Sequence, residues 1–256
     1  MYRSLLALAA SAALVFSAPA TAQTPDLSVA IEARDTGALT ALSTGRGREA
    51  SLARGVLAAL YRQDEEAIRS LRAAGRSRSL SPELRAAAWQ TLSGVYLRQS
   101  RFADAAAAMS AAAAFGIERD EATAAVNEQA RVFAEALAEA PRMRAEVAAS
   151  GETAITRDLA QLARAQTDIN GVTIDAVLDT GASYSTITQS EAERMRLRFL
   201  DAHVTVGSST GDADARLAIA DTLTLAGGVF HDVVFIVLPD EALTFGGGAY
   251  KIGAIV

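Results

Sequence analysis

The chain contains no cysteine, only two histidines and few clusters of basic residues. Without cysteine it can form no disulfide, carry no lipid-modified cysteine and perform no thiol chemistry. His203 and His231 stand alone, outside any His-x-x-x-His pair or carboxylate cluster typical of a metal site. A formal net charge of -6 argues against a nucleic-acid partner. The 256 residues are enough for two modest domains.

The chain also shows no apolar run long enough to span a bilayer comfortably. The run from Leu5 to Phe16 has about a dozen residues and follows the positively charged Arg3. Ala20-x-Ala22 then offers a cleavage site before Gln23. We therefore predict a signal peptide over residues 1–22, a periplasmic or secreted bacterial protein, and no membrane span after cleavage. An uncleaved anchor is the alternative.

Residues 23–150 are rich in Ala, Leu, Arg and Glu with helical periodicity, which predicts an all-α domain. Ser81-Pro82 resembles a helix start, with a serine cap and proline at the first helical position. The pattern after it, with Trp89 and Tyr96, is similar to the tetratricopeptide repeat of about 34 residues. A weaker copy around Gly55 precedes it, and a further helical pair is expected over residues 120–137. Such repeats form either a concave surface for a protein partner or a plain spacer.

Residues 151–256 change to short β-rich segments separated by glycine turns, which predicts a small all-β barrel. A capping box at Thr188 predicts one helix among the strands. Turns are expected at Asn170-Gly171, Gly207–Gly211 and Gly227-Gly228. The expected strands are Leu159–Ala165, Val172–Leu178, His203–Val206, Ala215–Ile219, Asp221–Leu225 and Val233–Leu238.

The most informative motif is Asp179-Thr180-Gly181-Ala182, which directly follows the apolar strand 172–178. This order places a carboxylate on a tight turn at a strand end. Glycine lets backbone N–H groups approach that carboxylate, because it has no Cβ. Two such carboxylates held close together share one proton, so that one acts as base and the other as acid on the same water.

Together with Ile169-Asn170-Gly171 and Ser185-Thr186-Ile187, this motif resembles the retropepsin-like aspartic proteases over residues 157–256. The resemblance implies that Asp179 activates water, that the Thr180 hydroxyl braces paired loops and that Gly181 forms the turn. It implies substrate contacts at Ala182 and Ser183. A glycine-bearing flap hairpin, with Ser208, Ser209, Thr210 and Gly211 at its tip, would close over a peptide or protein substrate.

A second Asp-Thr-Gly-Ala begins at Asp35, after the charged segment Glu32–Arg34. Nothing around it would bury the carboxylate, so we interpret it as a helix cap. Because the chain has a single credible motif, the pair of catalytic aspartates must come from two chains, which predicts a homodimer. No cofactor is expected. Two alternatives stay open. One is an adaptor that binds peptides beside an inactive barrel, and the other is a hydrolase that pairs one carboxylate with a histidine or a metal.

The segment Ala254-Ile255-Val256 resembles the start of the apolar-apolar-Gly turn that buttresses the catalytic loop in this family. The chain ends before that glycine. This departure suggests a fragment of a longer product, and predicts that Ile252, Ile255 and Val256 lie uncovered beside a catalytic loop without a packing partner.

Overall fold

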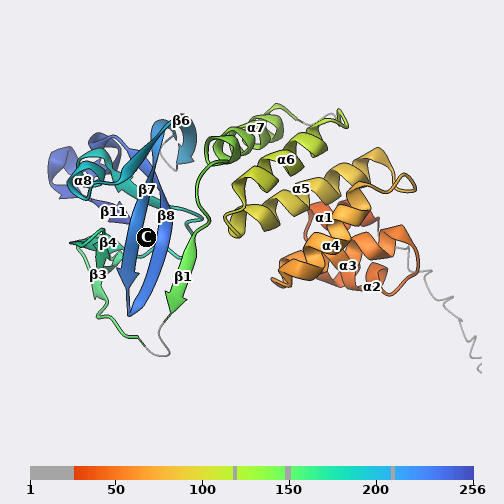
Figure 1. Ribbon diagram of the computed structural model, residues 1–256, viewed down its shortest axis with the longest axis horizontal. Helices are drawn as coiled ribbons and strands as arrows, with labels where there is room; N and C mark the ends of the chain where they lie inside the picture. Colours follow the sequence, from red (N-terminus) through yellow and green to blue (C-terminus); the bar gives the residue numbers. More distant parts are fainter. Residues whose placement is uncertain (1–25, 118–119, 148–150, 209–210) are drawn as a thin grey trace, which may run out of the picture.

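The computed structural model describes residues 26–117, 120–147, 151–208 and 211–256. Figure 1 shows a helical body followed along the chain by a body of strands, as the sequence predicts. The predicted signal peptide lies outside the described residues. Within those residues no helix combines the length and the apolar character needed to cross a membrane.

The helical body consists of helices that follow one another with short turns. They are α1 (Leu27–Glu32), α2 (Thr36–Ser43), α3 (Arg48–Leu60), α4 (Asp64–Gly75), α5 (Pro82–Arg98), α6 (Phe102–Ala113) and α7 (Glu121–Ala136). The start of α5 is confirmed, because the Ser81 hydroxyl accepts a hydrogen bond from the Leu84 N–H at 3.3 Å. Residues 120–137 form one helix and not the expected pair.

Small residues allow the helices to approach one another closely. A Cβ on Gly75 would lie 2.6 Å from the Trp89 ring, which instead donates a hydrogen bond to the Gly75 carbonyl. A Cβ on Gly55 would lie 3.0 Å from Ser70. The tetratricopeptide resemblance itself stays a prediction.

The second body is built on a nine-stranded sheet. Its strands are β1 (Arg144–Val147), β2 (Thr156–Arg157), β3 (Ala163–Ile169), β4 (Val172–Val177), β5 (Ser185–Thr188), β6 (Arg198–Ser208), β7 (Gly211–Leu225), β8 (Gly228–Leu238) and β11 (Ala254–Ile255). The pairings run around the ring β8-β5-β11-β4-β3-β7 and return to β8, so the sheet closes into a barrel. Remaining elements are α8 (Gln189–Arg194), η1 (Asp240–Leu243), β9 (Thr244–Phe245), η2 (Gly246–Gly248) and β10 (Tyr250–Lys251).

Two turns with positive φ join the strands, one of them where it was predicted. Asn170 and Gly171 both have positive φ, 51° and 80°, between β3 and β4. The turn expected at Gly227-Gly228 lies one residue earlier, because Gly228 already pairs with Leu225 and the central residues are Ala226 and Gly227, with φ of 49° and 78°. Positive φ at both central residues is typical of the hairpin turn whose twist matches that of its strands.

Several strand predictions are corrected. The strand expected at Leu159–Ala165 begins only at Ala163, and Leu159 is almost fully exposed. The two strands expected over residues 215–219 and 221–225 form the single long β7, because Ala220 between them is buried in the sheet. β1 pairs with β8, so the sheet already includes residues before the expected boundary at 150.

The capping box expected at Thr188 is wrong. Thr188 is the N-cap of α8, but its hydroxyl makes no capping hydrogen bond. The Thr188 hydroxyl oxygen is buried without a hydrogen-bond partner among the described residues. The backbone N–H of Thr188 donates instead to the Gly253 carbonyl at 3.0 Å.

The C-terminal segment is packed, which contradicts the expectation that it lies uncovered. β11 lies between β4 and β5, with Ile255 paired to Val177 and to Thr186. Ile252 is buried, while Ile255 and Val256 are half-buried against the barrel core. The loop after β4 therefore has a packing partner within these 256 residues.

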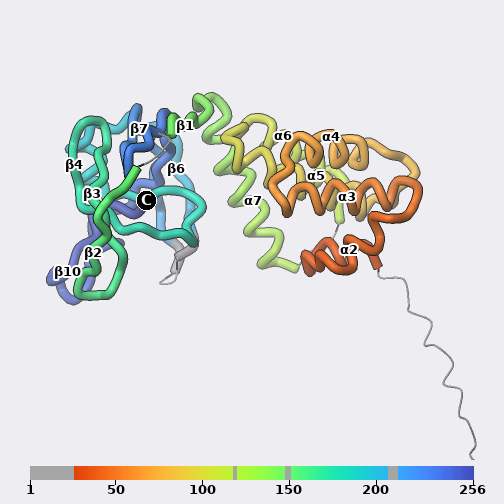
Figure 2. The backbone as a smooth tube through the Cα atoms, turned by 90° about the horizontal axis from the view of Figure 1, so that it is seen from below, coloured from red at the N-terminus to blue at the C-terminus, as the bar shows by residue number. Residues whose placement is uncertain are grey.

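The helical and β bodies share one apolar cluster. Leu137 and Phe102 are buried in it together with the barrel residues Val177, Val204 and Leu217. Figure 2 shows α7 on the side of the helical body that faces the barrel. This contact places the ends of α5 and α7 beside the loop that follows β4.

Candidate active site

Asp179 lies one residue beyond Leu178, where β4 leaves the barrel. Its own N–H donates to the Val256 carbonyl at 3.0 Å, and the Leu178 N–H donates to the Ala163 carbonyl at 2.8 Å. The backbone is thus held from both sides, by β3 and by the C-terminal segment. The carboxylate position is consequently set by the sheet and not by a free loop.

Gly181 holds the carboxylate. Its N–H donates to Asp179 Oδ1 at 2.8 Å, as predicted from the motif. A Cβ on Gly181 would lie 3.2 Å from the same oxygen. This is tighter than ordinary van der Waals contact, so a side chain would push the carboxylate away from its donor. The Ala182 N–H closes the turn on the Asp179 carbonyl at 3.2 Å.

The loop after β4 is exposed. Asp179, Thr180, Gly181, Ala182 and Ser183 are all exposed, whereas Ala176 and Val177 just before them are buried. The fold therefore brings the predicted catalytic residues and two predicted substrate contacts together on one open surface.

The predicted flap is a β-hairpin. β6 and β7 pair in antiparallel register up to Ser208 opposite Gly211. Ser209 and Thr210 at the tip lie outside the described residues. The prediction that these four residues contact substrate stays untested.

The motif at Asp35 behaves as the predicted cap. The Asp35 carboxylate accepts from the Ala38 N–H at 3.0 Å and starts α2. Helix α1, and not a strand, precedes it in the part of the chain that the structure describes. The same four residue types therefore give a helix cap in one place and a strand-end carboxylate in the other.

Part of the β-domain matches a known protein family. The aspartyl protease family model matches residues 165–248, which include Asp179 and the predicted flap. These residues are therefore similar to an aspartyl protease domain.

Two solved structures align with part of this chain. A retropepsin-like aspartic protease from Rickettsia conorii aligns at 16% identity over 45% of this chain and 78% of its own, with a TM-score of 0.28. The EIAV protease complexed with the inhibitor HBY-793 aligns at 19% identity over 34% of this chain and 90% of its own, with a TM-score of 0.24. No curated protein matches the chain.

The helical domain contacts the protease loop directly. The ring of Phe133 on α7 packs on Tyr184, which follows Ser183. Burial raises the pKa of Tyr184 to about 12, so its hydroxyl stays neutral over the pH range of ordinary enzymes. Sequence reasoning missed this pair, because nothing local in either segment signals the other.

A cleft of about 590 Å³ separates the two domains at this point. The protease domain lines it with Thr180–Ser185, Val233 and Val234, and the helical domain lines it mainly with residues of α5 and the turn before α4. Pockets of this size commonly hold ligands. The cleft directly adjoins the exposed turn of Asp179.

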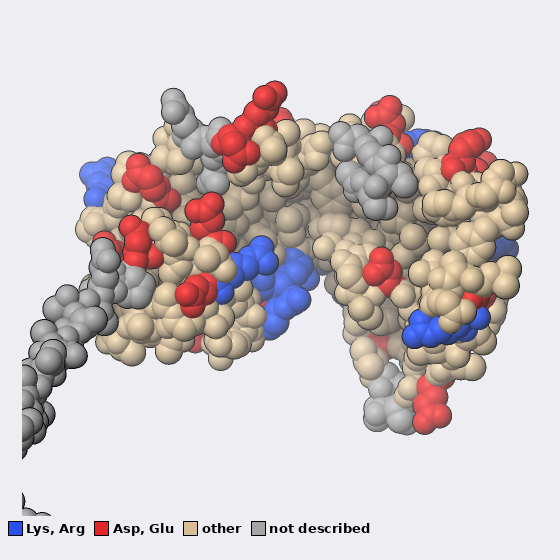
Figure 3. All heavy atoms as spheres, turned by 180° about the vertical axis from the view of Figure 1, so that it is seen from behind, with Lys and Arg blue, Asp and Glu red and all other residues tan. Residues whose placement is uncertain are grey.

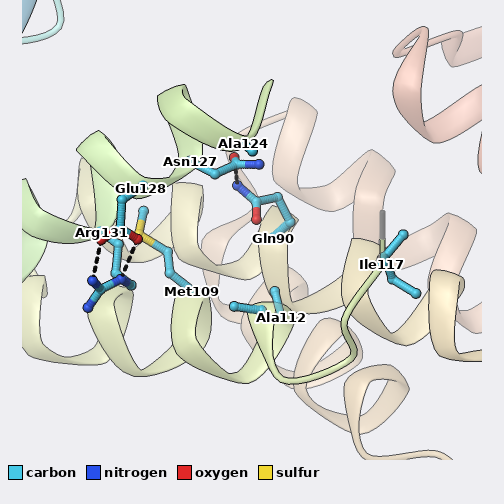
Figure 4. Close-up of a pocket in the computed structure, with 9 residues that line it drawn as sticks. Gln90, Met109, Ala112, Ile117, Ala124, Asn127, Glu128 and Arg131 are labelled. Carbon is cyan, nitrogen blue, oxygen red and sulfur yellow. Dashed lines mark hydrogen bonds and ion pairs between the residues drawn. The ribbon is translucent and has the colours of Figure 1, made fainter. Parts of the chain in front are cut away.

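A second groove lies within the helical domain, between α5, α6 and α7 (Figure 4). The polar side chains of this groove already form hydrogen bonds and ion pairs with one another or with neighbouring residues. Gln90 donates to Asn127 at 2.9 Å, and Arg131 pairs with Glu128 and Glu135. Because its charges are already compensated, this groove gives little support to a charged partner.

Within the described residues no three His, Cys, Asp or Glu side chains gather as metal ligands would. His231 instead lies 3.2 Å from Glu146, which joins β8 to β1 at the barrel edge.

Proposed function

We propose that the protein is an exported aspartic endopeptidase in which Asp179 activates the attacking water. One observation carries this proposal. A carboxylate fixed by a glycine N–H stands at the end of a barrel strand, on an exposed turn, inside the segment that matches the aspartyl protease family. The assignment of catalytic roles to Asp179, Thr180 and Gly181 rests on this position.

The proposed catalyst is a homodimer. No second carboxylate lines the cleft beside the turn among the described residues, and the sequence holds no other credible motif. The exposed turns of two protomers can face each other across a two-fold axis, which brings the two Asp179 carboxylates together. The exposure of Thr180 favours this arrangement, because its hydroxyl is open to a partner loop.

In this dimer one carboxylate is ionised and the other protonated, since like charges at short range cannot both ionise. The ionised carboxylate takes a proton from water as the water oxygen attacks the peptide carbonyl carbon. The protonated carboxylate donates to the carbonyl oxygen. The carboxyl group that took the proton from water then gives it to the amide nitrogen as the carbon–nitrogen bond breaks, and a hydroxyl of the intermediate returns its proton to the other carboxylate. Ala182, Ser183 and the flap residues 208–211 contact the substrate.

A peptide-library digestion tests this proposal. We expect cleavage with a bell-shaped pH dependence on the acid side of neutrality, unchanged by chelator. Sedimentation should show dimers under the conditions of activity. Cleavage that is abolished by chelator, or that only rises above neutral pH, would favour a metal or histidine mechanism. Full activity from a strict monomer would exclude the shared dyad.

The export proposal has a separate test. N-terminal sequencing of protein from its native host should find Gln23 as the first residue. An intact Met1 in a membrane fraction would replace a free periplasmic enzyme with a tethered one.

A further inference from the structure

The cleft between the two domains has walls of different character. The protease wall, Thr180–Ser185, consists of small and hydroxyl-bearing residues and Tyr184. The helical wall contributes two cationic side chains, Arg62 and Arg98, together with Ser100. None of the described lining residues is Asp or Glu. A peptide lying across the Asp179 turn can therefore extend into a positively charged recess.

The two arginines are not equivalent. Arg98 donates through Nε to Asp64 at 3.0 Å and through Nη2 to the Ala59 carbonyl at 3.1 Å. Although burial opposes its ionisation, Asp64 has a lowered pKa because of hydrogen bonds from Arg98 and Gln99 and the charges of Arg98 and Arg62. Asp64 stays ionised, so it compensates one of the two positive charges.

Arg62 supplies the remaining positive charge. It sits on the exposed turn between α3 and α4 with a positive φ of 60°. It has no ion-pair partner among the residues that the structure describes. Figure 3 shows Lys and Arg side chains gathered on the side of the helical body that borders the hollow next to the barrel.

We propose that the helical domain provides a subsite for an acidic side chain of the peptide substrate, and that Arg62 selects it. This inference rests on the proposed peptidase function and names its substrate class: peptides with Asp or Glu a few residues from the cleaved bond. Arg62 acts on specificity and takes no part in the chemistry at Asp179. The helical domain thereby becomes part of the substrate cleft.

The test measures binding separately from cleavage. The Asp179→Asn protein is titrated with two fluorescein-labelled random decapeptide pools, one with a single Glu and the other with Gln at that position. At low salt the Glu pool should bind about three- to tenfold more tightly, as expected for one partly screened ion pair. The difference should shrink as salt shortens the reach of the charges.

Adding Arg62→Gln to this protein should remove the preference, and Arg62→Glu should reverse it toward a matching Lys pool. Arg69→Gln is the matched control. It removes an equal charge from the exposed surface of α4 outside the cleft, and should keep the preference. Equal binding of the Glu and Gln pools, no binding of either, or a preference that survives Arg62→Gln would overturn the inference.

Peptidase assays of the unmutated protein test the peptidase function separately from the acidic subsite. Cleavage that shows no enrichment of Asp or Glu around the cut bonds would leave the protease function standing without this subsite. Glu-selective binding by a chain that cleaves nothing would retain the acidic subsite and reject the peptidase.

Discussion

The ring of Phe133 lies 4.6 Å from the ring of Tyr184, measured between centroids, with the two planes inclined by 55°. This tilted geometry is one that aromatic pairs favour. It joins the last helix of the helical domain to the residue next to Ser183 of the protease loop. The position of that loop therefore depends on the helical domain.

Phe133→Ala should weaken this connection. We expect a loss of about 2 kcal/mol in the free energy of unfolding, from lost apolar burial and the aromatic pair. Peptidase activity should fall as well, because Tyr184 loses its support. Denaturant unfolding and a peptide assay measure both. Val126→Ala, on the exposed face of the same helix, is the control and should change neither. Retention of full stability by Phe133→Ala would mean that the ring pair is incidental.

Gly181→Ala tests how the carboxylate is held. Its Cβ would crowd Asp179 Oδ1 at 3.2 Å, so activity should drop at least tenfold while the fold persists. Gly37→Ala is a close match, because its Cβ would lie 3.3 Å from Asp35 Oδ1 in the helix cap. That variant should keep full activity. Equal losses from the two changes would point to a general effect on folding.

The pH dependence of stability follows from two partly exposed carboxylate contacts. The hydrogen bond from Tyr250, helped by Arg164, lowers the pKa of Asp158 to about 2. Burial opposes ionisation of Asp240, but hydrogen bonds from Lys251 and Ser190 outweigh it and lower its pKa to about 2. Folded values below the unfolded value of about 3.9 stabilise the fold above that pH. This stability should be lost as the pH falls from about 4 to about 2.

Tyr250→Phe should raise the pKa of Asp158 toward its ordinary value. The variant should therefore be less stable than the parent above pH 4, and the difference should shrink toward pH 2. Unfolding curves at several pH values measure this, with the exposed Tyr61→Phe as control. A difference that stays constant with pH would show that Asp158 is not the group responsible.

Thr188→Val removes a buried hydroxyl that has no partner among the described residues. An unsatisfied buried hydroxyl is costly, so the variant should be about 1 kcal/mol more stable. Thr167 is equally buried, but its hydroxyl donates to the Ala165 carbonyl at 3.3 Å. Thr167→Val should therefore not stabilise. Thermal unfolding compares them, and a loss of stability in Thr188→Val would indicate an ordered water at that oxygen.

Features set by neighbours in the chain could be predicted from the sequence. The Ser81 cap, the Asn170-Gly171 turn, the helix cap at Asp35 and the Gly181 donor at Asp179 all depend on residues a few positions apart. Their local chemistry allows few alternatives.

Features that depend on distant segments could not be predicted in the same way. The Thr188 pattern matches a capping box, yet its backbone N–H donates to the distant Gly253 carbonyl and its hydroxyl is buried without a partner among the described residues. The burial of Ile252 depends on the barrel closing around it. Arg62 and Tyr184 line the same cleft only because α7 packs on the barrel. The hydrophobic periodicity of the sequence does not predict that contact.

The most direct test of the catalytic assignment compares Asp179→Asn with Asp35→Asn in one peptidase assay at mildly acidic pH. The two positions share the motif Asp-Thr-Gly-Ala, and both changes remove one negative charge. Asp179→Asn should reduce cleavage by several orders of magnitude without unfolding the chain, whereas Asp35→Asn should leave it unchanged. Undiminished cleavage by a folded Asp179→Asn protein would contradict the assignment.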